Sequence, residues 1–124
     1  MKQLLAIALG GATGAVLRYE VSTTVYRMLG QSFPFGTLAV NTLGSLCMGL
    51  LYIIFLERIS ASPELRALLL IGLLGAFTTF STFSLETLNL IEQGEQIKAV
   101  ANVLLSVVLC IGSAWLGLFI GRQI

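Results

Sequence analysis

Four long stretches of the sequence are predominantly apolar, and they constrain the fold more than any other feature; the first is interrupted by Arg18 and Glu20. They cover about residues 4–28, 36–56, 67–91 and 99–121. A helix needs about 20 predominantly apolar residues to cross the hydrocarbon core of a bilayer. Hydrophobic residues make up 56% of the chain and charged residues only 10%, whereas soluble domains carry about 25% charged residues. We therefore expect an all-α membrane protein in which residues 1–124 form a single domain of four transmembrane helices.

The composition also argues against several classes of function. The chain has no histidine and no aspartate, so it cannot build a Ser-His-Asp triad or a histidine-ligated zinc site. Its net charge of +1 supplies no basic surface for nucleic acid. Cys47 and Cys110 lie inside apolar stretches, where a thiol behaves as a small hydrophobe. We therefore expect neither an enzyme nor a nucleic-acid partner.

The lysines and arginines divide almost equally between the two sides of the membrane that four crossings define. One side holds Lys2, Arg58, Arg66 and Arg122, and the other holds Arg18, Arg27 and Lys98. An excess of positive charge sets the orientation of a membrane protein, and a difference of one residue gives almost no bias. The chain could therefore insert both ways up, and two opposite copies could form an antiparallel, dual-topology homodimer. A single, weakly biased topology stays open.

Two of the stretches carry polar residues along one helical face. At 100° per residue each set falls within an arc of about 80°. The sets are Thr37, Asn41 and Ser45 in the second stretch and Asn102, Ser106, Cys110 and Ser113 in the fourth. Such residues either join helices by hydrogen bonds, worth about 0.6 kcal/mol each, or line a polar path. For Asn41 the second interpretation gains weight, because an amide NH2 group can donate to an anion.

The third stretch contains an unusual segment near its middle. Residues 72–86 read GLLGAFTTFSTFSLE, with two glycines and five hydroxyl side chains. We expect the helix to break there, around residues 75–78. Non-helical backbone at membrane depth is tolerated only where it is buried in protein or lines a cavity. Carbonyl groups freed by such a break could coordinate a cation.

Hydroxyl and aromatic side chains share one face after the expected break. That face carries Thr79, Thr82, Phe83 and Glu86, with Phe80 at its flank. An aromatic ring has a positive edge, so a phenylalanine can stabilise a small anion through its rim. The plain alternative is that the two phenylalanines pack as ordinary apolar residues.

The sequence resembles the fluoride channel family known as CrcB or Fluc along its whole length. The resemblance rests on residues 10–19 (GGATGAVLRY), residues 36–41 (GTLAVN) and the TTFSTFSLE run at residues 78–86. The third of these motifs is the specific one. The family implies a dual-topology homodimer in the bacterial inner (plasma) membrane, with two antiparallel pores that export fluoride passively.

The resemblance also implies roles for individual residues. Phe80 and Phe83 would be the pore phenylalanines, and Asn41 the amide that fluoride meets. The other pore residues would be Thr79, Thr82, Ser106 and Cys110 along a polar track, with Glu86 near one end of it and Arg18 near a vestibule. The backbone carbonyls of Gly75 and Thr78, contributed by both chains, would hold a structural sodium ion at the dimer centre.

The chain departs from the family pattern at two positions, and two other functions stay open. Cys110 stands where family members often have serine, and Ala76 replaces a second glycine. A four-helix, dual-topology, proton-coupled exporter of small molecules would need a carboxylate within the membrane, for which Glu86 is the only candidate at depth. A non-transporting membrane subunit would use the polar residues for packing alone.

Overall fold

The computed structural model describes residues 1–124, and every regular element in it is a helix. In chain order these are α1 (Lys2–Leu29), α2 (Phe35–Ile53), η1 (Ile54–Arg58), α3 (Pro63–Arg66), η2 (Ala67–Leu74), α4 (Gly75–Phe77), α5 (Phe80–Glu92) and α6 (Gln96–Gln123). The two η segments are wider π-helical continuations of their neighbours. Four helical rods are long and apolar enough to span a membrane, namely Lys2–Leu29, Phe35–Arg58, Pro63–Glu92 and Gln96–Gln123. The prediction of four spanning helices is therefore confirmed.

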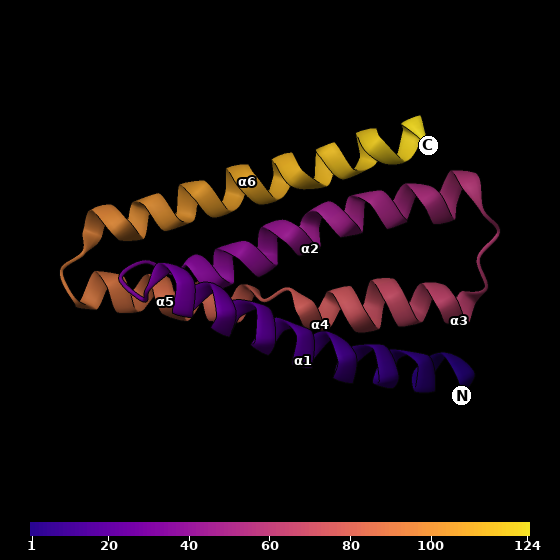
Figure 1. Ribbon diagram of the computed structural model, residues 1–124, viewed down its shortest axis with the longest axis horizontal. Helices are drawn as coiled ribbons and strands as arrows, with labels where there is room; N and C mark the ends of the chain where they lie inside the picture. The colour runs from indigo at the N-terminus through magenta and orange to yellow at the C-terminus, as the bar shows by residue number, and fades with distance from the viewer.

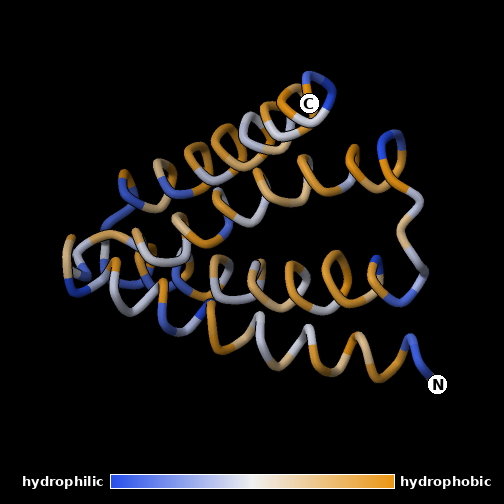
Figure 2. Tube along the Cα trace, turned by 45° about the vertical axis from the view of Figure 1, so that its right-hand side comes forward, coloured by the Kyte–Doolittle hydropathy of each residue, from blue (hydrophilic) through white to orange (hydrophobic).

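The four rods form two closely packed pairs (Figure 1). α6 lies along α2, and α1 lies along η2 and α4. Both termini lie at the same end of the molecule, beside the connection from η1 to α3 (Figure 1). Figure 2 shows hydrophobic residues along the rods and hydrophilic residues at their ends and in the connections. This distribution suits a bundle whose long axis crosses the bilayer.

Local sequence signals set the ends of the rods. Gly30 directly follows α1 and Gly94 lies in the connection after α5, and both glycines have positive φ angles, 84° and 78°. The left-handed region that they occupy is open to glycine at little cost. Pro63 begins α3 at a position where its missing N–H group is harmless, and Ser62 caps that helix by accepting a hydrogen bond from the N–H of Leu65 at 3.2 Å.

The third rod consists of two helical parts separated by extended backbone. Thr78 has φ −87° and ψ 156°, and Thr79 has φ −151° and ψ 114°. The sequence led us to expect the break around residues 75–78, whereas the extended residues are 78 and 79, because Gly75–Phe77 still forms the short helix α4. Thr79 starts α5 as its N-cap, since its hydroxyl accepts a hydrogen bond from the N–H of Thr82 at 3.2 Å. An N-cap threonine is a favoured way to begin a helix.

Glycines allow the paired rods to approach each other closely. A Cβ atom at Gly49 of α2 would overlap the carbonyl oxygen of Ala114, and one at Gly117 of α6 would overlap that of Leu46. The same holds for Gly10 of α1, which faces the carbonyl of Leu68. Small residues of this kind are the usual means of close packing in membrane helices. They fix α2 against α6, and these helices supply two walls of the cavity described below.

Replacing Gly117 with alanine tests this packing. The new methyl group would meet backbone rather than a flexible side chain, and overpacking of this kind costs about 1–3 kcal/mol. We expect Gly117→Ala to lower the thermal unfolding midpoint of the protein in detergent. Gly112→Ala is the matched control on the same helix, because a Cβ atom at Gly112 meets nothing within 4 Å. Equal midpoints for the two variants would contradict the close α2–α6 contact.

Candidate functional site

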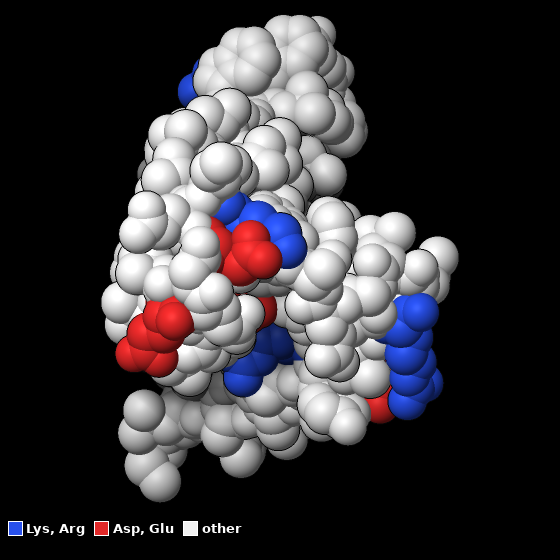
Figure 3. Space-filling model, turned by 90° about the vertical axis from the view of Figure 1, so that its left-hand side faces the viewer, with Lys and Arg blue, Asp and Glu red and all other residues white.

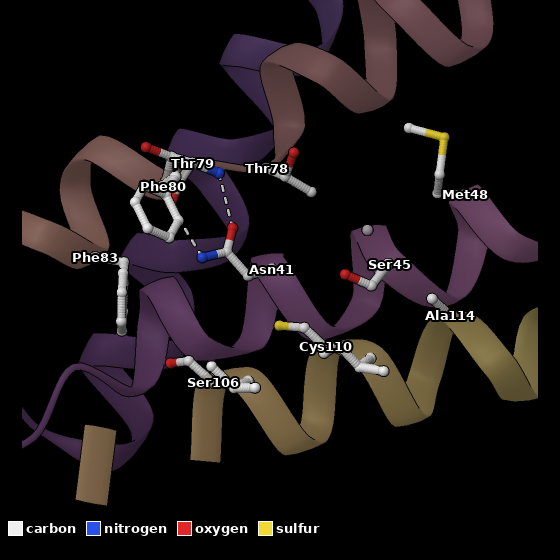
Figure 4. A pocket seen from close by; sticks show the side chains of 13 residues that line it. Asn41, Ser45, Met48, Thr78, Thr79, Phe80, Phe83, Ser106, Cys110 and Ala114 are labelled. Carbon is white, nitrogen blue, oxygen red and sulfur yellow. Dashed lines mark hydrogen bonds between the residues drawn. The ribbon is translucent and has the colours of Figure 1, made fainter. Parts of the chain in front are cut away.

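A cavity of about 390 Å³ lies between α2, α6 and the region where α4 gives way to α5 (Figure 4). Its lining includes residues from all three polar sets that the sequence singled out. Six of the predicted pore residues line it: Asn41, Thr79, Phe80, Phe83, Ser106 and Cys110. The side chains of Ser45 and Met48 continue the same wall on α2. No lysine, arginine, aspartate or glutamate lines this cavity.

Asn41 holds the extended backbone between the two parts of the third rod. Its Nδ2 donates a hydrogen bond to the carbonyl of Thr79 at 3.0 Å, and its Oδ1 accepts one from the N–H of the same residue at 2.7 Å (Figure 4). The side-chain amide thus forms with the Thr79 backbone the same pair of hydrogen bonds that a residue of a neighbouring β-strand would form. One of the two Nδ2 hydrogens remains free for another acceptor. The sequence suggested a donor to an anion, and the geometry adds a role in holding the backbone.

The two phenylalanines stand next to each other at the start of α5. Their ring centroids are 5.3 Å apart and the ring planes are inclined by 47°. Phe80 is 78% exposed in the single chain, and Phe83 is half-buried. Both rings border the cavity (Figure 4). A single chain therefore covers only one side of the Phe80 ring.

Hydrogen bonds connect α6 to the backbone of Phe83. Asn102 is 1% exposed, and its Nδ2 donates to the hydroxyl of Thr87 at 2.9 Å. Thr87 in turn donates to the carbonyl of Phe83 at 2.8 Å. Ser106 lies one turn further along α6, where its hydroxyl donates to Asn102 Oδ1 at 3.5 Å. Asn102 therefore has a packing role, which is one of the two roles that the sequence left open.

A second hollow, of about 550 Å³, opens at the end of the molecule that carries the residue 30–34 and 93–95 connections. Thr82 and Glu86, the other two predicted pore residues, line this hollow rather than the first. Lys98 lines it too. Figure 3 looks onto this end, where acidic and basic side chains surround a depression. The predicted polar track is thus divided between two neighbouring hollows along α5.

Tyr26 is a residue of the second hollow that the sequence reasoning missed. Its hydroxyl donates a hydrogen bond to Glu86 Oε2 at 2.6 Å, and Thr37 donates to the other oxygen of the same carboxylate. The only feature of the sequence that could have indicated Tyr26 is its place near the end of the first apolar stretch, residues 4–28. Its partner lies 60 residues away on another helix, and no local pattern reports such a pairing.

Arg18 is the predicted residue that the structure does not bring to the others. It lies on α1, partly exposed, and it lines neither of the two hollows. It forms no ion pair, because the single salt bridge of the chain joins Lys98 to Glu95 at 3.6 Å.

The carbonyls of Gly75 and Thr78 lack their ordinary helical partners. In a continuous helix they would accept from the N–H groups of Thr79 and Thr82, four residues on. Those groups instead donate to Asn41 Oδ1 and to the Thr79 hydroxyl. Free carbonyl oxygens suit a hard cation, so the donor set fits a sodium ion. No cluster of histidine, cysteine, aspartate or glutamate side chains offers another metal site.

Comparison with known proteins gives a consistent result. Residues 5–118 match the family described as CrcB-like protein, Camphor Resistance (CrcB). A protein of Coxiella burnetii (strain Dugway 5J108-111) named fluoride-specific ion channel FluC is 57% identical over 122 residues, which are 98% of each chain. A protein of the same name from Magnetococcus marinus is 56% identical over 122 residues, 98% of this chain and 99% of its own. Another from Shewanella denitrificans is 57% identical over 118 residues, 94% of each chain.

The family match covers most of all four spanning helices and every residue that lines the two hollows, and it confirms the resemblance that the three sequence motifs indicated. The four spans also make the protein an integral membrane protein of the multi-pass kind. This chain belongs to the CrcB family.

Proposed function

We propose that this chain is a fluoride-selective channel through which the ion leaves the cell passively. The single observation that carries the proposal is the cavity in which Asn41, two phenylalanines and α6 polar groups converge without any charged side chain. The relatives that match nearly the whole chain are named fluoride-specific ion channels, and they support the same function. A channel moves an ion across the membrane without changing it chemically, so this function requires no catalytic residues.

The chemistry of the cavity suits the smallest halide. Fluoride holds its water strongly, so a selective path must replace that water with several donors and remain narrow. The free Nδ2 hydrogen of Asn41, the thiol of Cys110 and the positive ring edges of the phenylalanines are such groups. Because no lysine or arginine lines the cavity, no fixed cation would trap the ion, and weak binding is what permits exit from a channel.

We further propose that the functional unit is an antiparallel, dual-topology homodimer with two pores. The near-balance of positive charge between the two sides supports insertion in both orientations. The exposure of Phe80, 78% in the single chain, supports a second copy that completes the wall beside its ring. In a bacterium this assembly would lie in the inner (plasma) membrane, where it would lower cytoplasmic fluoride and confer fluoride resistance.

A structural sodium ion between the two copies is also part of the proposal. Gly75 is exposed on the surface of the single chain, so a partner can reach this position. Together with Thr78 it would supply two carbonyl ligands from each copy. The bound ion would offset the carbonyl dipoles left by the interrupted helix, and this chain's own part is to hold those carbonyls in place through Asn41 and Thr79.

A proton-coupled exporter is the alternative that these observations favour less. Such a protein needs a membrane carboxylate that binds and releases protons during transport. Glu86 is the candidate, and both of its oxygens already accept hydrogen bonds from hydroxyl groups. The names of the relatives also do not favour it.

Substituting each phenylalanine with isoleucine tests the role of the ring edges. The isoleucine side chain keeps the apolar character and loses the polarised rim, which is worth roughly 1 kcal/mol in aromatic contacts. We expect Phe80→Ile and Phe83→Ile each to slow fluoride efflux from proteoliposomes by about fivefold. Phe119→Ile is the matched control, because that ring packs on Trp115 at 5.9 Å, away from the cavity. Wild-type vesicles that release chloride as fast as fluoride would contradict the proposed function.

Labelling from outside the cell tests the dual topology. Ser60 and Ser32 lie in exposed connections at opposite ends of the bundle. If half of the copies are inverted, a membrane-impermeant maleimide applied to intact cells should label roughly half of Ser60→Cys and roughly half of Ser32→Cys. The unsubstituted protein is the control, since Cys47 and Cys110 lie within spanning helices. Full labelling of one variant and none of the other would contradict the antiparallel dimer.

A further inference from the structure

The carboxylate of Glu86 is enclosed by side chains from two other helices. Tyr26 of α1 donates to Oε2 at 2.6 Å, and Thr37 of α2 donates to Oε1. The two hydroxyl oxygens are 3.3 Å apart. Neither lysine nor arginine pairs with this carboxylate. Its charge is therefore compensated within the protein by two hydroxyl dipoles.

The fold makes room for the Tyr26 ring. A Cβ atom at Gly36, the second residue of α2, would overlap the ring edge of Tyr26 and the carbonyl of Ser22. The ring thus packs against the backbone of α2, one residue before Thr37, which is 4% exposed. This close packing of the ring against Gly36 determines where the phenol oxygen lies. The Tyr26 ring is therefore held by packing against α2, and it forms part of the wall of the hollow.

Glu86 stands in the hollow next to the cavity that holds the phenylalanines. Thr82, one turn earlier on α5, lines the same hollow, whereas Phe83 lines the cavity. In the proposed channel, an ion that moves from the cavity along α5 enters a hollow that Glu86 lines. A carboxylate that swings freely into the path would repel it, and the repulsion grows as the effective dielectric constant falls. The position of the Glu86 side chain therefore matters to anion passage.

We propose that Tyr26 is a positioning residue that fixes the Glu86 carboxylate against α1 and α2 and so keeps the passage between the two hollows open to fluoride. This inference rests on the proposed channel function. In this proposal Tyr26 acts through the carboxylate, to which it donates its hydrogen bond. The Thr37 hydroxyl alone would hold one oxygen of Glu86 and leave the other free to rotate toward the path.

The Tyr26→Phe variant tests this role, because it removes the phenol oxygen and keeps the ring in its seat. We expect fluoride efflux from proteoliposomes to fall by about fivefold, within the reach of one lost hydrogen bond to a charged group, with the preference for fluoride over chloride unchanged. Tyr52→Phe is the matched control, since Tyr52 is 51% exposed and makes no side-chain hydrogen bond to the protein. Efflux equal to that of the wild type would overturn the inference.

Infrared difference spectroscopy separates positioning from a general structural effect. The carboxyl band of Glu86, identified by its loss in Glu86→Gln, should shift to higher frequency in Tyr26→Phe and stay in place in Tyr52→Phe. A band that does not move would overturn the inference even if efflux falls. Absence of fluoride flux through the wild-type protein would instead refute the channel function, so the two failures are distinguishable.

Discussion

The pairing of the Asn41 side chain with the backbone of Thr79 is the interaction on which the rest of the site depends. Two extended residues inside a membrane-spanning rod leave peptide groups without helical partners, and in hydrocarbon each such group costs several kcal/mol. Asn41 satisfies one N–H and one carbonyl together. It thereby holds the rod in two parts, and the second part begins with the hydroxyl and phenylalanine residues that border the cavity.

Several features of the proposed channel follow from this interrupted rod. The start of α5 brings Phe80 and Phe83 beside each other and turns the first ring outward, where a second copy can cover it. The same geometry leaves Gly75 exposed at the surface of the single chain. Glycine contacts between α2 and α6 then fix the opposite wall at close range. A cavity that joins a few polar groups to apolar walls without any charged side chain needs both the interruption and the close packing.

The sequence predicted the features that depend on local pattern and missed those that depend on distant partners. The four spans could be read from the length of apolar runs, and the observed rods extend a few residues further because polar residues continue their ends. Helical spacing placed Asn41, Ser106 and Cys110 on faces that do converge. The Asn41–Thr79 pairing and the Tyr26–Glu86 hydrogen bond join helices far apart in sequence, and the π-helical segments have no simple signature.

Amide hydrogen exchange at Thr79, measured by solid-state NMR in bilayers, tests the central claim most directly. The account predicts slow exchange in the wild type, because the N–H of this buried residue donates to Asn41 Oδ1 at 2.7 Å. In Asn41→Ala the exchange at Thr79 should accelerate by about tenfold or more, while amides in the middle of α6 keep their wild-type rates. Unchanged protection of Thr79 in the variant would contradict the account.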